Sequence, residues 1–464
     1  MTSLTNVPFD EIKIGQSITV SRTLSQTDIE SLAFTSGDVD AYHLENGERG
    51  DVANSTEAVA SEAFFAYLLN RRLPGPGSTI VAEEFRFKGR LCVADAVTAT
   101  VTVKEKRDGD VVVFDCRCVN QGNDTIAVGT ATVIAPTRRI VYADLATPEV
   151  IFRRTDAFAR LIQSCEGLPP VTCAVVHPCD HDSLVGPIEA AKRKLITPML
   201  VGPEDKIKAA ADAAKVDLRD FQIVNVEHSH AAAAKAVAMA RAGEVEALMK
   251  GSLHTDELMG AVVPSATGLR TSRRISHVFV LDVPAYPRML LVSDAAINIA
   301  PDLKSKVHIV QNAIDLAKVL GIEEPKVAIL SAVETVNPDI PSTLDAAALC
   351  KMADRGQLVG GILDGPLAFD NAVSEQAAKT KKIDSPVAGK ADVLIAPDLE
   401  AANMLAKQLQ YLAGADAAGI VLGARVPIVL TSRADTVRTR LASAGVMARV
   451  AQARRNVAAS SAGS

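Results

Sequence analysis

The chain has 464 residues, of which 48% are hydrophobic and 22% are charged, and its formal net charge is −6. This length is enough for two or three domains, each with its own core, and the composition is that of a globular enzyme rather than a disordered chain. The acidic balance excludes nucleic acid as the main partner, although it allows a local basic pocket for a small phosphorylated molecule.

Seven cysteines occur at scattered positions. Their odd number and irregular spacing do not form a disulfide framework, so we expect a reducing, cytoplasmic environment. The N-terminus lacks a basic segment followed by an apolar core, so no signal peptide is predicted. No apolar run reaches the ~18 residues that would span a bilayer, and no membrane association is expected.

The first 136 residues combine one long helix with antiparallel strands. Residues 53–72 carry an apolar face at helical spacing and are followed by the helix-stopping segment LPGPG. Residues 80–134 contain Val- and Thr-rich runs separated by the turn sequences RDGD and NQGND. This pattern predicts a helix followed by a meander of long strands.

The segment SGDVDAYHLE, residues 36–45, places Asp38 and His43 five residues apart. Its simplest interpretation is a surface turn. Together with LPGPGSTIV and EEFRFKGRLCVAD (83–95), however, it resembles the MaoC-like hot-dog family of enoyl-CoA hydratases. The resemblance implies that Asp38 and His43 activate the water that adds to an α,β-unsaturated thioester. It also implies that the backbone N–H of Ala58, near the start of the helix, stabilises the thioester oxygen.

Two positions differ from the usual pattern of that family. Asp40 and Ala41 stand where the family has Asn-Pro, and Thr56-Glu57-Ala58 replaces its Ala-His-Gly. Two hypotheses therefore remain for this part of the chain. It is an active hydratase, or it is a CoA-binding or oligomerisation module without catalysis.

After residue 136 the pattern changes. Residues 137–152 are expected to form a linker. Residues 153–456 alternate short apolar runs such as TCAVVH and KVAILS with Ala-rich helical segments, which predicts a parallel sheet with helices on both faces. Residues 457–464 are expected to form a flexible tail.

The segment GIVLGARVPIVLTSRADT, residues 419–436, contains a strand-like run that leads into Ser432, Arg433 and Asp435. Ligands of open α/β folds bind at such strand ends, and the planar fork of an arginine suits a phosphate. The residues alone are equally compatible with a loop in which Arg433 and Asp435 simply pair with each other.

Together with DGPLAFDNAVS (364–374) and VAGKADVLIAPDLEAANMLAK (387–407), this segment resembles the phosphate acetyl/butyryltransferase family, and more closely its butyryl-type branch. The resemblance implies exchange of a short acyl group between CoA and inorganic phosphate, without a metal or a tightly bound cofactor. Ser432 would stabilise the transition state and Arg433 would bind phosphate. Asp435 is the nearest candidate for the base that deprotonates the CoA thiol.

The same resemblance implies further substrate contacts. These fall at Lys250, Gly251, Arg274, Ser276, Asn403 and Lys407. For the basic pair at 273–274, a solvated turn is the simpler alternative. A metal site in HPCDHDS (177–183) is not predicted, because zinc patterns usually pair such ligands with a second cluster and none is evident.

The sequence therefore predicts an α+β hot-dog domain followed by an α/β domain with a parallel sheet, similar to the isopropylmalate dehydrogenases, in two subdomains. Because the two families use different dimer contacts, we expect a homo-oligomer larger than a dimer. A third hypothesis is a metal-dependent dehydrogenase on the same fold, which the lack of a paired-aspartate metal motif argues against.

Overall fold

The computed structural model describes residues 3–25, 28, 31, 55–89, 91, 94–143, 157–432 and 435–462. The chain divides into two compact units, residues 1–152 and 153–464. Three predicted site residues, Asp38, His43 and Arg433, lie outside the described residues.

The first unit contains a five-stranded antiparallel sheet and one long helix, α3 (Ser55–Arg71), as the sequence predicted. The strands lie in the order β2 (Ser17–Thr23), β4 (Ala96–Arg107), β5 (Val111–Val119), β6 (Thr125–Ile134) and β3 (Thr79–Phe87). Alternate residues of β4 point inward, so that Val97, Val101 and Val103 pack in one core with Phe65 and Leu68 of α3.

A separate short pairing occupies part of the predicted linker. Strand β7 (Val141–Ala143) pairs antiparallel with β1 (Ser3–Thr5), and a 3₁₀ turn, η1 (Phe9–Glu11), follows β1. Residues 137–152 are therefore partly β structure tied to the N-terminal strand, a pairing too short to be visible as a periodic pattern.

The second unit is built on one eleven-stranded sheet. In spatial order its strands are β10 (Gln222–Asn225), β9 (Ile196–Gly202), β8 (Val171–Val176), β11 (Ala247–Lys250), β18 (Ile428–Val429), β17 (Asp416–Leu422), β12 (Ser276–Asp282), β13 (Leu290–Ser293), β16 (Val393–Ile395), β14 (Lys326–Leu330) and β15 (Ile362–Leu367).

The sheet is mixed rather than parallel. The first five strands run parallel to one another, and so do the last four. Antiparallel pairings of β17 with β18 and of β12 with both β17 and β13 join the two sets. As a result, the two parallel sets run in opposite directions, and their carboxyl ends point to opposite sides of the sheet along the strand direction.

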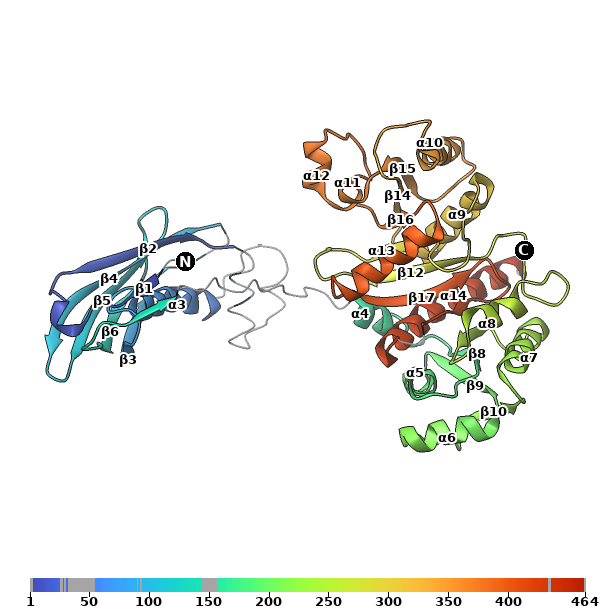
Figure 1. Ribbon diagram of the computed structural model, residues 1–464, viewed down its shortest axis with the longest axis horizontal. Helices are drawn as coiled ribbons and strands as arrows, with labels where there is room; N and C mark the ends of the chain where they lie inside the picture. The colour runs from blue at the N-terminus through green and yellow to red at the C-terminus, as the bar shows by residue number, and fades with distance from the viewer. Residues whose placement is uncertain are drawn as a thin grey trace. The chain divides into compact units, whose positions relative to one another are not determined.

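Helices cover both faces of this sheet (Figure 1). They are α4 (Ala157–Gln163), α5 (His181–Lys192), α6 (Glu204–Ala214), α7 (Ser229–Ala242), α8 (Thr255–Val262), α9 (Leu303–Val319), α10 (Pro341–Asp354), α11 (Phe369–Val373), α12 (Glu375–Thr380), α13 (Leu399–Tyr411) and α14 (Val437–Ala462). The predicted flexible tail is therefore helical as far as Ala462.

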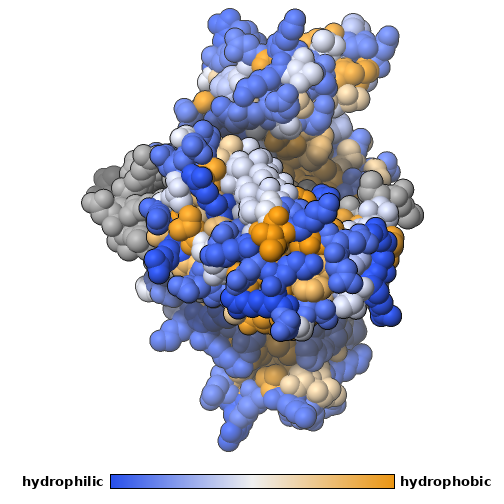
Figure 2. Space-filling model, turned by 90° about the vertical axis from the view of Figure 1, so that its left-hand side faces the viewer, coloured by the Kyte–Doolittle hydropathy of each residue, from blue (hydrophilic) through white to orange (hydrophobic). Residues whose placement is uncertain are grey.

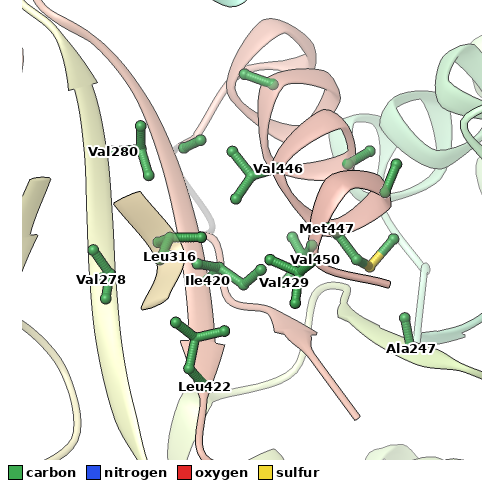
Figure 3. Packing of buried hydrophobic residues seen from close by; sticks show 14 of the residues in the cluster. Ala247, Val278, Val280, Leu316, Ile420, Leu422, Val429, Val446, Met447 and Val450 are labelled. Atoms are coloured by element: carbon green, nitrogen blue, oxygen red, sulfur yellow. The ribbon is translucent and has the colours of Figure 1, made fainter. Parts of the chain in front are cut away.

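On one face, α14 packs across the middle of the sheet. Figure 3 shows Val446 and Met447 of this helix beside Ile420 and Val429 of the central strands. The other face carries two separate clusters, one beneath α7 and α8 and one beneath α11, α12 and α13.

Among the described residues, no helix has both the length and the apolar character to cross a bilayer. The surface in Figure 2 is mostly hydrophilic, with hydrophobic residues in small separate patches.

Candidate active site at the end of strand β18

The loop that follows β18 is a compact turn that presents Ser432 to solvent. The backbone N–H of Ser432 donates to the Asp435 carboxylate (2.6 Å), and the N–H of Asp435 donates to the carbonyl of Ser432 (3.2 Å). Thr431 and Asp435 are buried, whereas Ser432 is exposed. The reciprocal bonds therefore join Ser432 to Asp435 and leave Ser432 at the surface.

Asp435 is engaged within this turn. One oxygen accepts the Ser432 N–H, and the other lies 3.5 Å from the side-chain amide nitrogen of Gln410 in α13. A buried carboxylate held in this way orients the loop. The structure thus shows Asp435 holding the turn and α13 together, and its role as a base stays a prediction.

Two buried cations lie beneath the loop, Lys250 (2% exposed) and Arg440 (1% exposed). The ammonium of Lys250 donates to the carbonyls of Thr431 (3.2 Å) and Gly251 (3.5 Å). The guanidinium of Arg440 donates to the Lys250 carbonyl (3.2 Å), the Thr431 hydroxyl (2.8 Å) and the Ser432 carbonyl (3.1 Å). These bonds tie the ends of β11 and β18 together and place positive charge at the base of the turn.

Arg440 was missed in the sequence. It lies in α14 against Gly186, where an added Cβ would stand 2.8 Å from both Cβ and Cδ of the arginine. Burial lowers the pKa of the Arg440 guanidinium, and the carboxylates of Asp180, Asp435 and Asp182 partly offset this effect. One signal was available: position 440 shares a helix face with the buried Ala444 and Met447, at spacings of four and seven residues.

Gly251 follows β11 at a point of close backbone contact. A Cβ on this residue would lie 2.5 Å from the carbonyl oxygens of Val176 and His177. The approach of the end of β8 is therefore sufficient to require glycine at this position.

Helix α13 forms one side of the same region. Asn403, Lys407 and Gln410 lie along one of its faces, and Gln410 reaches the Ser432 loop through Asp435. The side-chain amide of Asn403 donates to the carbonyl of Ala295 (3.0 Å). The ammonium of Lys407 lies 5.8 Å from the ring centroid of Phe279, over the sheet.

His277 is a second residue that the sequence analysis did not single out. It is fully buried in β12, and burial lowers the pKa of its imidazole to about 4, aided by Lys407 and opposed by a hydrogen bond to the backbone of Leu430. Gly419 leaves room for this contact, since a Cβ there would lie 3.0 Å from Nε2 of His277 and 2.5 Å from the Leu430 carbonyl. A neutral imidazole thus holds the chain two residues before Ser432.

Arg274 and Ser276 are not brought to this loop. Ser276 is buried and its hydroxyl accepts from the Asn312 amide (2.7 Å). The N–H of Leu430 donates to Gly419 (3.2 Å), which puts Ser432 near the level of Ala417. Arg274 lies instead beside Gly423, six residues further along β17 and its extension, or about 20 Å away.

The HPCDHDS segment forms an ordinary turn and helix start. His177 Nδ1 lies 2.9 Å from the Ser252 hydroxyl, Asp180 caps α5 by accepting from the Ser183 N–H (2.8 Å), and His181 pairs with Asp182 (2.8 Å). Within the part of the chain that the structure describes, no group of three or more His, Cys, Asp or Glu side chains is placed to hold a metal ion.

In the first unit, Ala58 is the fourth residue of α3. Its backbone N–H therefore lies at the end of the first helical turn. Its predicted partners Asp38 and His43 belong to the part of the chain that the structure does not describe.

Known proteins that are similar to this chain match its second unit. Residues 230–448 match the family model described as phosphate acetyl/butaryl transferase. A phosphate acetyltransferase of Rhizobium meliloti is 64% identical over 298 residues, which cover 64% of this chain and 94% of the relative. A phosphate butyryltransferase of Clostridium acetobutylicum is 40% identical over 295 residues, covering 64% of this chain and 98% of the relative.

A solved structure has the same fold. The branched-chain phosphotransacylase of Enterococcus faecalis is 29% identical, with a TM-score of 0.53, over 61% of this chain and 99% of that one. With a relative that is 64% identical and matched over nearly its whole length, the chain belongs to the phosphate acetyl/butyryltransferase family.

Proposed function

We propose that the second unit transfers a short acyl group between coenzyme A and inorganic phosphate. The observation that carries the proposal is the exposed Ser432 turn above two buried cations, next in sequence to Arg433. Acetyl is the first acyl group to test, because the relative that is 64% identical bears the name phosphate acetyltransferase.

The chemistry needs positive charge at three moments. The CoA sulfur attacks the carbonyl carbon of the acyl phosphate as a thiolate, an oxyanion develops on the carbonyl oxygen, and the C–O bond to phosphate then breaks. A CoA thioester and inorganic phosphate are the products, and no tightly bound cofactor takes part. The Ser432 hydroxyl donates to the oxyanion and Arg433 receives the departing phosphate.

The proton of the thiol leaves before the attack. A free thiol has a pKa near 8.5, so only a few per cent is ionised at neutral pH. Because the Asp435 carboxylate already accepts two hydrogen bonds, we assign stabilisation of the thiolate to the electrostatic field of Lys250 and Arg440, and the released proton passes to bulk water. Lys407, whose ammonium lies over the sheet beside the loop, adds to this field.

Thiol release from acetyl-CoA or butyryl-CoA in the presence of phosphate tests the assignment. We expect phosphate-dependent release that Arg433→Ala reduces at least 100-fold and that Ser432→Ala reduces to a similar extent. Arg219→Ala, at an exposed arginine of the same unit, is the matched control. Absence of phosphate-dependent release with every short acyl-CoA would exclude the transferase.

For the first unit we propose an enoyl-CoA hydratase of the hot-dog type. The supporting observation is the packing of α3 against one face of the five-stranded antiparallel sheet, with the N–H of Ala58 in the first turn. Asp38 and His43 would activate the water. Hydration of crotonyl-CoA can be monitored as the loss of enoyl absorbance. We expect the Asp38→Asn variant to show no such loss.

The alternative for this unit is a CoA-binding or oligomerisation module. Strand β3 ends the order of the sheet, and its Val81 and Phe87 are 51% and 46% exposed. Such an edge is a template for pairing with a second copy. If wild type and Asp38→Asn are equally inactive while Val81→Lys lowers the mass measured by sedimentation, the module is favoured over the hydratase.

A further inference from the structure

His177 follows β8 at the same edge of the sheet as the Ser432 turn. Strand β11 separates β8 from β18, with Lys250 beside Val176 in the ladder and its ammonium on the carbonyl of Thr431 (3.2 Å). Neighbouring strands are ~4.8 Å apart, so the backbones of His177 and Thr431 are about 10 Å apart. From β8 the chain continues to β9 on one side, whereas β11 lies on the other, and α/β folds bind ligands at such changes of strand order.

The backbone of His177 is fixed in a conformation that few residues adopt. Its φ is 56°, in the left-handed region. Its N–H donates to the carbonyl of Val201 (2.7 Å), and its own carbonyl accepts from the N–H groups of Cys179 (3.0 Å) and Ser252 (2.9 Å). Gly202 leaves room for it, since an added Cβ there would lie 3.3 Å from the Cα of His177. Residues held in sparsely populated conformations by such contacts cluster at functional sites.

The hydroxyl of Ser252 determines which ring nitrogen of His177 carries the hydrogen. Its oxygen lies 2.8 Å from the His177 carbonyl oxygen, 2.9 Å from Nδ1 and 3.3 Å from the backbone nitrogen of Cys179. A hydroxyl has one hydrogen, and a carbonyl oxygen can only accept. All three contacts join a donor to an acceptor only if the hydroxyl donates to the carbonyl and Nδ1–H donates to the hydroxyl. In the neutral ring Nε2 then carries a lone pair, and Nε2 makes no hydrogen bond with the described residues.

The surroundings of the ring favour its neutral form at pH 7. Burial lowers the pKa of the His177 imidazole, and the ammonium of Lys206 in α6 lowers it further. The carboxylates of Glu257 in α8 and of Asp180, before α5, oppose this shift. Burial raises the pKa of the neighbouring Cys179 thiol to about 11, so this thiol stays protonated at neutral pH. His177 is therefore an uncharged acceptor of protons at this edge of the sheet.

We propose that Nε2 of His177 accepts the proton of the CoA thiol and passes it to bulk water, a role that rests on the proposed acyl transfer. As the S–H bond breaks, its electron pair stays on sulfur, which becomes the thiolate, and an N–H bond forms at Nε2. The half-buried imidazolium, whose Nδ1–H remains on Ser252, then releases the proton to solvent. The thiolate is left between the ring and the acyl phosphate at Ser432, in the field of Lys250 and Arg440.

Formation of acetyl-CoA from acetyl phosphate and CoA by the full chain, followed by thioester absorbance between pH 6 and pH 9, tests this role. His177→Asn is the informative variant. Asparagine tolerates a positive φ, and its side-chain N–H₂ can replace Nδ1–H on Ser252, whereas Nε2 is lost. We expect kcat to fall about 100-fold at pH 7, the lower end of the usual contribution of a positioned base. His181→Asn, at an exposed histidine four residues along the chain, should match wild type.

The pH profile and chemical rescue distinguish a proton acceptor from a structural residue. The deficit of His177→Asn should shrink towards pH 9, because the thiol, with a pKa near 8.5, then ionises without a base. Wild-type kcat should be nearly constant above pH 6.5, because the pKa of His177 is lowered from that value. His177→Gly, in which glycine suits the left-handed backbone, should regain activity about tenfold on addition of imidazole, whereas Arg433→Ala should not.

The role is overturned if His177→Asn keeps the wild-type kcat, if its deficit is the same at pH 6.5 and pH 9, or if imidazole does not accelerate His177→Gly. A wild type that forms neither acetyl-CoA nor butyryl-CoA rejects the acyl transfer itself and this role with it, whereas a full rate in His177→Asn rejects the role alone.

A measurement without substrate tests the same nitrogen. The chemical shifts of ¹⁵N-labelled histidine report the tautomer at pH 7.5, with the signals of His177 assigned by their loss in His177→Asn. We expect Nδ1–H and an unprotonated Nε2. The opposite tautomer would overturn the role whatever the outcome of the transferase assay.

Discussion

Arg440 shows how much a single side chain organises this site. Three of its hydrogen bonds end on atoms of Lys250, Thr431 and Ser432, and its charge is buried. Replacing an arginine fork by lysine preserves the charge but cannot reproduce the planar set of donors.

We therefore expect Arg440→Lys to lower kcat at least tenfold and to destabilise the second unit by about 2 kcal/mol, the order of one or two lost hydrogen bonds to a charged group. Steady-state kinetics and urea unfolding measure the two effects. Arg449→Lys, in the same helix but bonded to the carbonyl of Val319, is the matched control. Equal losses of kcat and of stability in both variants would contradict the specific role of Arg440 in holding the Ser432 loop.

His277 predicts a pH dependence of stability. Burial lowers the pKa of its imidazole to about 4 in the folded chain, from 6.5. The unfolded state therefore binds more protons between these values, so the contribution is present above pH 6.5 and is lost as the pH falls towards 4.

The size of that loss is about 3 kcal/mol. We expect His277→Gln to remove this part of the acid sensitivity, measured as the change in unfolding free energy between pH 7 and pH 4.5. The exposed His181→Gln should keep it. If His277→Gln and wild type lose stability in parallel as the pH falls, the imidazole is not the group responsible.

At the scale of elements, Gly419 allows β17 to pack closely against His277 of β12 and against Leu430, which follows β18. The Leu430 carbonyl and the His277 imidazole both occupy the space where a side chain would stand. Gly419→Ala should therefore displace β18 and the turn that follows it, with a loss of several-fold in kcat and about 1–3 kcal/mol in stability.

The control is Gly260→Ala. Gly260 lies in α8 with nothing within 4 Å of an added Cβ, so alanine there should be neutral or stabilising by up to about 1 kcal/mol. Thermal unfolding and initial rates compare the two variants. Normal activity in Gly419→Ala would show that the loop tolerates movement of β18.

The sequence predicted the elements better than their directions. Runs such as KVAIL and VTCAVV are mostly apolar because both faces of the sheet are covered, and they were recognised as strands. A strand that is buried on both faces carries no sign of its direction. The reversal at β17, β12 and β13 was therefore invisible, and with it the separation of Arg274 from Ser432.

The strand-like run that leads into Ser432 was predicted from continuous sequence. His277 and Arg440, in contrast, come from segments far apart in sequence. Their parts depend on tertiary contacts with backbone carbonyls, which leave no pattern in one sequence.

The whole molecule consists of two units with independent cores. One hydrophobic cluster lies wholly in residues 1–152, and three others lie wholly in residues 153–464. The R. meliloti relative is matched over 94% of its length by 298 residues of this chain.

A truncated chain of residues 153–464 should therefore fold and retain the proposed acyl transfer with kcat within about twofold of the full chain. Circular dichroism and the thiol-release assay test this directly. A soluble but inactive truncated chain would mean that the first unit contributes to the transferase site. An insoluble truncated chain would mean that the second unit needs the first in order to fold.

The seven-residue antiparallel ladder between β12 and β17 has a mechanical consequence. Continuous backbone hydrogen bonds between β12 and β17 connect the two parallel sets of strands in the second unit, so the two halves do not meet at a flexible hinge. Any closing motion around a bound substrate must therefore twist these strands slightly along their whole length. The backbone amides of the ladder should be among the slowest in the chain to exchange with deuterium, whereas amides at the periphery of each half should exchange faster.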